Sequence, residues 1–182
     1  MASRTDFCNV IDVESTCGSE VKTSEIIQIG ICTINVNKLS IENSQRLYIC
    51  PQKSKITSYC TQLTGISFAD VENAPLFPCV MELLFEQYEL SRRPWVSWGD
   101  YDREQFIKMA SIYNTRYFFG KSHINLKCEF ALLMGLKREI GLVEATKRMG
   151  IGFEGTNHDG LDDAINTARI YIEIVRLFRG EN

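Results

Sequence analysis

The pattern of hydrophobic and polar positions divides the chain into a first part that favours strands and a second part that mixes helices with strands. β-Branched and aromatic residues dominate three runs, FCNVIDVE (7–14), EIIQIGICTINV (25–36) and SQRLYICP (44–51). Short polar turns separate these runs, and such an arrangement predicts a three-stranded antiparallel meander.

After residue 51 the period of the hydrophobic positions changes, and helical patterns surround two short apolar runs. The predicted helices cover 74–90, 102–114, 128–135, 142–150 and 161–178, and the predicted strands cover 94–98 and 123–127. This order of elements indicates an α/β layer fold with a mixed sheet. Because no repeat or low-complexity stretch interrupts it, we expect one domain over 1–182 with its core at about 7–178.

Composition is that of an ordinary globular protein, with 45% hydrophobic and 24% charged residues among 182. The seven cysteines are odd in number and form no CxxC pair, so we expect reduced core thiols and neither a disulfide framework nor a zinc site. No apolar run is long enough to cross a bilayer or to serve as a signal peptide. We therefore expect a cytoplasmic, intracellular protein without a membrane partner; the sequence does not indicate an oligomeric state.

The net charge of −3 does not by itself indicate a nucleic-acid-binding protein. Clustered carboxylates that hold two divalent cations would nevertheless gain a charge of about +4, which makes such a site locally positive. The overall charge therefore does not exclude a nucleic-acid substrate.

Asp12 and Glu14 lie two residues apart at the end of the first predicted strand. Their side chains leave the same face of the strand, whereas Ile11 and Val13 point to the other face. Two neighbouring carboxylates on an otherwise apolar strand either bind cations or have raised pKa values. Because exposed strand ends also carry acids, this pair alone does not identify a site.

The segment WGDYD, where a predicted strand leads into a helix, offers two further aspartates. Asp100 occupies the N-cap position, where its side chain is expected to accept hydrogen bonds from free backbone N–H groups. Asp102 shares a helical row with Phe106, Met109 and Tyr113, so it is expected to face the core.

The same reasoning from helical rows predicts which side chains of the segment HDGLDD, near the C-terminus, point inward. Asp159 is placed to cap the last helix, and His158 is expected to reach inward from the preceding loop. Asp163 is expected to point inward, because its row continues through Thr167, Ile170, Ile174 and Leu177. Asp162 is expected to face solvent, because its row continues through Asn166, Arg169, Glu173 and Arg176.

These rows select Asp12, Glu14, Asp102 and Asp163 as inward-facing acids, with His158 beside them. Carboxylates without a cysteine or a second histidine favour Mg²⁺ or Mn²⁺ over zinc. Such a site suits phosphoryl transfer, in which two ions about 3.5 to 4 Å apart stabilise the attacking and leaving oxygens. A histidine is a suitable general base for the attacking water.

The order and spacing of these residues resemble the DEDDh 3′-to-5′ exonucleases. The segments VIDVESTC, TQLTGI, WGDYD and HDGLDDAINTARI are similar to the Eri-type branch, which includes the histone mRNA 3′ exonuclease, and the resemblance runs from about residue 7 to 178. It implies a ribonuclease H-like α/β fold with a central mixed five-stranded sheet flanked by helices. It also implies stepwise release of mononucleotides from the 3′ ends of single-stranded RNA.

The resemblance also assigns roles to the five residues. Asp12, Glu14 and Asp163 would hold the tighter of two Mg²⁺ or Mn²⁺ ions. Asp12 would also reach the second ion, on which Asp102 would act largely through water. His158 would be the general base.

The resemblance further implies a set of substrate-binding residues, namely Ser15, Tyr59, Leu63, Thr64 and Tyr101. Tyr101 stands where this branch often has Trp, and it is expected to stack on the 3′-terminal base with Tyr59 on the other side. The alternative is that both tyrosines are half-buried packing residues.

Two other functions compete with an RNA exonuclease. The chain could prefer single-stranded DNA, because recognition of the 2′-hydroxyl depends on backbone geometry that the motifs do not fix. It could also be a non-catalytic nucleic-acid-binding module, although the presence of all five site residues favours an enzyme. We expect no appended RNA-binding module, so the sequence does not indicate how the chain is targeted.

Overall fold

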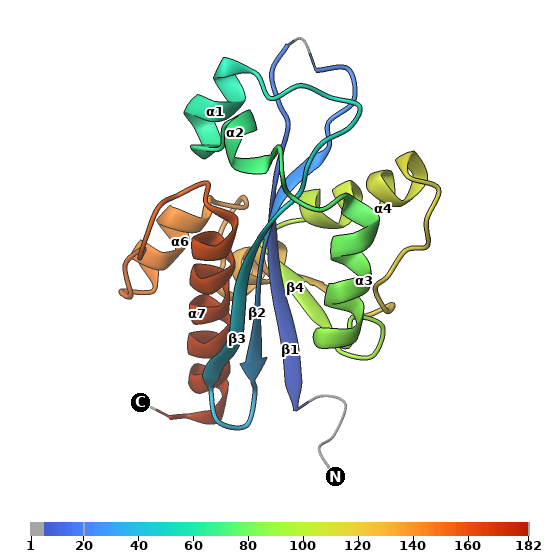
Figure 1. Cartoon of the computed structure of the whole chain (residues 1–182). Helices are drawn as coiled ribbons and strands as arrows, with labels where there is room; N and C mark the ends of the chain where they lie inside the picture. The colour runs from blue at the N-terminus through green and yellow to red at the C-terminus, as the bar shows by residue number, and fades with distance from the viewer. Residues whose placement is uncertain (1–5, 20, 182) are drawn as a thin grey trace.

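The computed structural model describes residues 6–19 and 21–181, and its strands form one mixed sheet in the order β3-β2-β1-β4-β5 (Figure 1). The strands are β1 (Phe7–Ser15), β2 (Ile26–Asn35), β3 (Ser40–Tyr48), β4 (Trp95–Ser97) and β5 (His123–Asn125). β2 is antiparallel to both β1 and β3, whereas β4 is parallel to both β1 and β5. The predicted meander and the mixed sheet are therefore confirmed.

The edge strand β3 begins earlier than the sequence predicted. Its expected range was 44–51, but pairing with β2 already starts at Ser40, which lies opposite Asn35. The run from Ser40 to Gln45 is mostly polar, because an edge strand has only one neighbour and many of its side chains reach solvent. A search for apolar strand runs misses such a segment.

Helices flank both faces of the sheet (Figure 1). They are α1 (Ser58–Thr64), α2 (Phe68–Val71), α3 (Phe77–Gln87), α4 (Tyr101–Ile112), α5 (Leu126–Leu133), α6 (Leu142–Arg148) and α7 (Gly160–Arg179). The five predicted helices are confirmed with shifted ends. The longest, α7, lies along β1, β2 and β3.

The short helices α1 and α2 were missed from the sequence. Thr57 caps α1 by accepting a hydrogen bond from the Cys60 N–H at 3.0 Å, and Gly65 ends it in the left-handed conformation with φ 74°. Ser67 and Asp70 form a capping box at the start of α2. These end signals are visible in the sequence, but helices of this length are too short to show a hydrophobic period.

The alternation of side chains along β1 puts the two faces of the sheet to different uses. Ile11 and Val13 join the hydrophobic cluster formed with α3 and α4. Val10 joins the cluster on the opposite face, with residues from α5, α6 and α7. Asp12 and Glu14 follow Val10 at intervals of two residues, so they belong to the face covered by α7.

The N-terminus of α7 touches β2 directly. A Cβ atom added to Gly30 would lie 2.0 Å from the backbone of Gly160, so a side chain there cannot be accommodated. The Gly160 N–H also donates to the Gln28 Oε1 at 2.6 Å. This close approach brings the first turn of α7 over the end of β1.

The cysteine expectation is partly wrong. The seven cysteines are all free thiols, as predicted, but Cys79 and Cys128 are exposed and therefore not core residues. Both lie on helix surfaces outside the apolar strand runs. Within the described parts of the chain, no helix is long and apolar enough to cross a membrane.

Candidate active site

A cleft of about 840 Å³ opens at the end of the sheet where β1 and β4 finish. Functional groups commonly gather at the carboxyl ends of neighbouring parallel strands. The cleft is lined by Asp12, Val13, Glu14, Ser15, Cys17, Leu63, Trp98, Tyr101, Asp102, Gly141, Leu142, Val143, Glu144, Lys147, Asn157, His158 and Asp163. All five residues of the predicted constellation are therefore brought together.

Asp102 connects α4 to β1. Its carboxylate Oδ1 accepts a hydrogen bond from the Val13 N–H at 2.9 Å, and the residue is only 4% exposed. Phe106 and Met109 are buried on the same helical row, which confirms the predicted inward direction. This contact holds the carboxylate against the strand that carries Asp12 and Glu14.

The predicted capping role of Asp100 is wrong. Asp100 occupies the N-cap position of α4, but among the described residues its side chain makes no capping hydrogen bond. Its Oδ2 instead accepts from the Asn125 Nδ2 at 2.8 Å, at the end of the neighbouring strand β5. The Asp100 carboxylate thus binds Asn125, 25 residues away in sequence, in place of the N–H groups at the start of α4.

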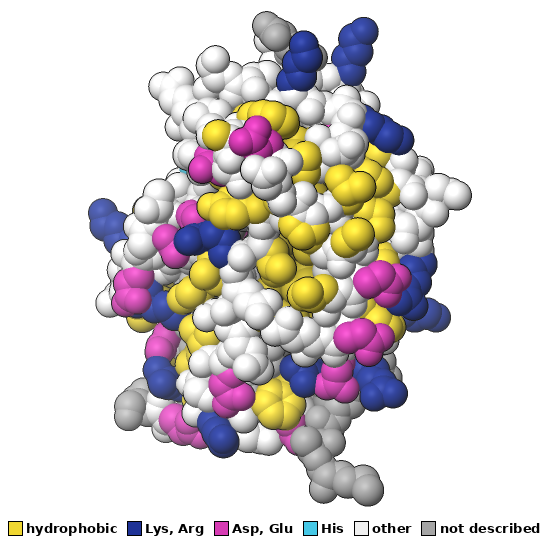
Figure 2. All heavy atoms as spheres, viewed as in Figure 1, with side chains coloured by type: hydrophobic (Ala, Val, Ile, Leu, Met, Phe, Trp, Pro, Cys, Tyr) yellow, Lys and Arg dark blue, Asp and Glu magenta, His cyan; other side chains and the backbone are white. Residues whose placement is uncertain are grey.

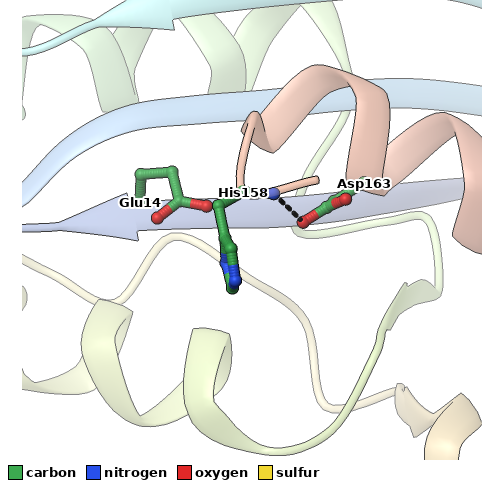
Figure 3. A group of neighbouring side chains, drawn as sticks. All are labelled: Glu14, His158 and Asp163. Atoms are coloured by element: carbon green, nitrogen blue, oxygen red, sulfur yellow. Dashed lines mark hydrogen bonds between the residues drawn. The ribbon is translucent and has the colours of Figure 1, made fainter. Parts of the chain in front are cut away.

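Glu14, His158 and Asp163 meet on one side of the cleft (Figure 3). Each offers a ligand atom, and these atoms all lie within 4.8 Å of one another. The His158 N–H donates to the Asp163 Oδ2 at 3.1 Å, whereas the Asp163 Oδ1 is buried with no hydrogen-bond partner among the described residues. A buried carboxylate oxygen without a partner indicates that this group is built to bind something else.

At the start of α7 the predicted cap and the inward direction of Asp163 are correct, whereas the row predicted to face solvent is partly buried, with the side chains of Asp162 and Arg169 only 25% and 19% exposed. Asp159 caps the helix by accepting from the N–H groups of Leu161 and Asp162, both at 3.1 Å. Asn166 is not on a solvated face: it is buried and exchanges hydrogen bonds with the Glu154 backbone. Leu177, expected to face inward, is 62% exposed near the C-terminal end of α7.

The cleft raises the pKa values of its acids. Burial, followed by repulsion from Asp163, Asp102 and Asp159, raises the pKa of Glu14 to about 8. Burial also raises the pKa of Asp102 and of Asp163 to about 7, although hydrogen bonds from backbone N–H groups oppose the rise. The pKa of Asp12 is well above its usual value because of burial and the charges of Asp102, Asp163 and Glu14.

These residues fit a divalent cation site. Crowded carboxylates with raised pKa values require positive charge to be ionised together near neutral pH. Their oxygens are the ligands that hard cations prefer, and the Asp163 Oδ1 has no hydrogen-bond partner among the described residues. On the face drawn in Figure 2, acidic and basic side chains are interspersed without a continuous basic surface. Among the described residues that line the cleft, Lys147 is the one Lys or Arg, so further positive charge for an anionic ligand would come from bound cations.

Only some of the predicted substrate-binding residues line the cleft. Ser15, Leu63 and Tyr101 line the cleft, and Tyr101 is 50% exposed. Tyr59 lines a second pocket, which shares no lining residue with the cleft, and its predicted stacking role stays a prediction. Thr64 is buried and its hydroxyl donates to the Cys60 carbonyl at 2.9 Å, a contact within α1.

One wall of the cleft was not predicted. Leu142, Val143 and Lys147 of α6 line it, together with Trp98 from the end of β4. The sequence indicated that α6 is a helix, but nothing in its pattern indicated that it faces the acids. Trp98 is fixed by a hydrogen bond from its Nε1 to the Ile140 carbonyl at 3.2 Å, just before α6.

Comparison with known proteins identifies the family. The family profile described as RNase_T: Exonuclease matches residues 10–171 of this chain. The chain therefore belongs to this exonuclease family.

Its relatives include named exoribonucleases. The chain is 28% identical to 3'-5' exoribonuclease 1 of Rattus norvegicus, over 94% of this chain and 53% of the rat protein. It is 30% identical to human ERI1 exoribonuclease 3, over 88% of this chain and 51% of that protein. The chain thus spans about half the length of these relatives.

Solved structures show the same fold. The nuclease domain of 3'hExo, a DEDDh family member bound to rAMP, superposes with a TM-score of 0.87 and 26% identity over 99% of this chain and 96% of that one. A 3'-exonuclease that recognises the 3′ end of a histone mRNA stem-loop has a TM-score of 0.86 and 25% identity, over 96% of this chain and 65% of that one. The expected ribonuclease H-like exonuclease fold is confirmed.

The raised pKa values predict how stability depends on pH when metal is absent. Because the folded-state pKa values exceed those of the unfolded chain, these acids favour folding when protonated, and this contribution is lost as pH rises from about 4 to about 8. Urea unfolding in the presence of a chelator is expected to show a falling free energy of unfolding over this range, with a shallower slope for Asp163→Asn. Equal slopes in both proteins would contradict this electrostatic account.

Proposed function

We propose that this chain is a metal-dependent 3′-to-5′ exonuclease that releases mononucleotides from single-stranded RNA. Asp12, Glu14, Asp102 and Asp163 would hold two Mg²⁺ or Mn²⁺ ions, and His158 would be the general base. The observation that carries this proposal is the convergence of four carboxylates and one imidazole in a single cleft of a chain that belongs to an exonuclease family.

In this proposal, His158 and the acids divide the chemistry. The bound ions would orient the phosphodiester and neutralise charge on the attacking and leaving oxygens. His158 lies on an exposed loop at the cleft, where its imidazole can accept a proton from the water that attacks phosphorus. The bond from phosphorus to the 3′ oxygen breaks, and the new 3′ end retains that oxygen.

RNA is proposed as the substrate because of the relatives. The similar nuclease domain is described with rAMP, and the similar 3'-exonuclease is described with a histone mRNA stem-loop. Single-stranded DNA is the alternative, since a cleft lined by carboxylates and aromatic residues can bind either sugar.

The experiment is hydrolysis of labelled RNA and DNA of identical sequence, each with Mg²⁺, Mn²⁺ or a chelator. We expect cleavage of RNA with either metal, slower cleavage of DNA, and no cleavage with chelator. Faster cleavage of DNA would reassign the substrate, and metal-independent cleavage of either strand would contradict the proposed function.

Tyr101 is expected to contribute to binding of the 3′-terminal base. It directly precedes Asp102 and lines the cleft with half of its surface exposed, so a base bound near the acids can stack on its ring. Stacking contributes about 1 to 3 kcal/mol per base and tolerates any base. Tyr101→Ala should therefore raise KM about 5-fold or more with little dependence on the terminal base, while Tyr101→Trp should preserve it.

The measurement is steady-state kinetics on oligonucleotides that differ only in the last base. Tyr59→Ala tests the second predicted stacking residue in the same assay. An unaltered KM in Tyr101→Ala would leave this tyrosine as a packing residue.

A further inference from the structure

Arg46 on β3 connects the edge of the sheet to the loop that carries His158. Its Nε and Nη2 atoms both donate to the Asp159 Oδ1, at 3.2 Å and 2.6 Å. The same Nη2 lies 3.7 Å from the Asp162 Oδ1. The contact spans 113 positions in sequence and joins an edge strand to the first turn of α7.

Asp159 is a junction between this arginine and the candidate active site. Its Oδ1 also accepts from the N–H groups of Leu161 and Asp162, so one oxygen serves both the helix cap and the arginine. The preceding residue is His158, and Asp163 lies one helical turn further on. A displacement of Asp159 would therefore move both His158 and Asp163 relative to Glu14.

The conformation of His158 requires such restraint. Its φ is 65°, in the left-handed region that residues other than glycine enter at a cost of about 1 to 3 kcal/mol. Besides the hydrogen bonds of the helix cap, the contacts that hold the loop around it include those of the His158 N–H with Asp163, the Gly160 N–H with Gln28, and Arg46 with Asp159. Of these, only the arginine acts through a charged pair at the solvent boundary.

The positive charge of Arg46 also offsets the electrostatic repulsion between Asp159 and the acids of the cleft. The Asp159 carboxylate adds to the repulsion that raises the pKa values of Asp12, Glu14 and Asp163. The guanidinium that pairs with Asp159 has its own pKa raised, chiefly by their hydrogen bond. The pair thus permits a negatively charged helix cap beside an acidic cleft.

We propose that Arg46 is a positioning residue for the reaction: by holding Asp159, it keeps His158 in the left-handed conformation that places the imidazole beside Glu14 and Asp163. The proposal rests on the proposed function, since it assumes that the imidazole acts on the substrate. It assigns a role in turnover to a side chain on the edge strand, outside the residues that line the cleft.

If Arg46 only stabilised the fold, its substitution would change the free energy of unfolding and not kcat. An ion pair whose side chains are 36% and 18% exposed contributes only about 0 to 1 kcal/mol to folding. Misplacement of a reacting group by about 1 Å can lower the rate by about 100-fold. Arg46→Met is therefore expected to lower kcat about 10-fold or more, with KM and Tm nearly unchanged.

The test compares Arg46→Met in two backgrounds, the natural chain and His158→Ala, by single-turnover hydrolysis of RNA. We expect the loss in the natural chain and no further loss when the imidazole is absent. Arg116→Met is the control for loss of an exposed arginine pair outside the cleft lining, because Arg116 pairs with Glu82 at 2.9 Å, while its guanidinium also lies over the Phe85 and Phe118 rings. If Arg46→Met does not fold, Arg46→Gln takes its place. An unchanged kcat, or an equal loss in both backgrounds, would overturn the proposal.

A second readout does not depend on activity. The chain has only two histidines, so the imidazole resonances of His158 and His123 can be separated by NMR in the metal-free protein. Arg46→Met is expected to shift or broaden the His158 resonance, whereas Arg116→Met is expected to leave it in place. An unaltered His158 resonance would contradict the positioning role even if the natural chain proves to have no exonuclease activity.

Discussion

The Asp163→Asn variant is expected to lose at least about 1,000-fold in metal-dependent turnover of RNA. Removing one preorganised electrostatic contact in an active site already costs about 100- to 1,000-fold, and Asp163 would both bind metal and fix the His158 loop. Asn retains the size of the side chain and one carbonyl oxygen but removes the charge. The measurement is single-turnover hydrolysis at saturating Mn²⁺.

The fold of Asp163→Asn is expected to be at least as stable as that of the natural chain without metal. Burial and repulsion raise the pKa of this carboxyl to about 7, so replacing it by a neutral amide relieves a cost. Glu173→Gln is the control, because Glu173 lies on the same helix but pairs with Arg176 away from the cleft. Undiminished turnover in Asp163→Asn would remove this aspartate from the site.

The second large effect is expected for His158→Ala. Loss of a general base typically costs about 100- to 10,000-fold, so kcat should fall by about 100-fold or more. Metal binding should change little, because the four carboxylates remain. An unchanged kcat in His158→Ala would show that another group takes the proton of the attacking water.

Local periodicity was sufficient to predict the inward-facing acids. In β1 the period of two residues places Asp12 and Glu14 on one face, and Ile11 and Val13 pack on the other. In α4 and α7 the helical period separated Asp102 and Asp163 from their neighbouring aspartates, as their burial confirms. These predictions succeeded because each depends only on residues within the same element.

Predictions failed where the hydrogen-bond partner of a side chain lies far away in the sequence. Asp100, which follows β4, accepts a hydrogen bond from Asn125 at the end of β5. Asn166 donates a hydrogen bond to the Glu154 carbonyl in the loop before α7. No local pattern contains such pairs, and the pairing of Arg46 with Asp159 belongs to the same class. The α6 wall of the cleft also depends on how helices pack around the sheet, which the hydrophobic period does not specify.

The most direct test of the central claim is the direction and product of RNA cleavage. One RNA carries its label at the 3′ end and the other at the 5′ end, and both are followed over time with Mn²⁺. We predict that the 3′ label appears at once as a mononucleotide, while the 5′-labelled strand shortens one nucleotide at a time. Neither change should occur with Asp163→Asn or with chelator. Early internal fragments, or release of the 5′ label first, would contradict a 3′-to-5′ exonuclease.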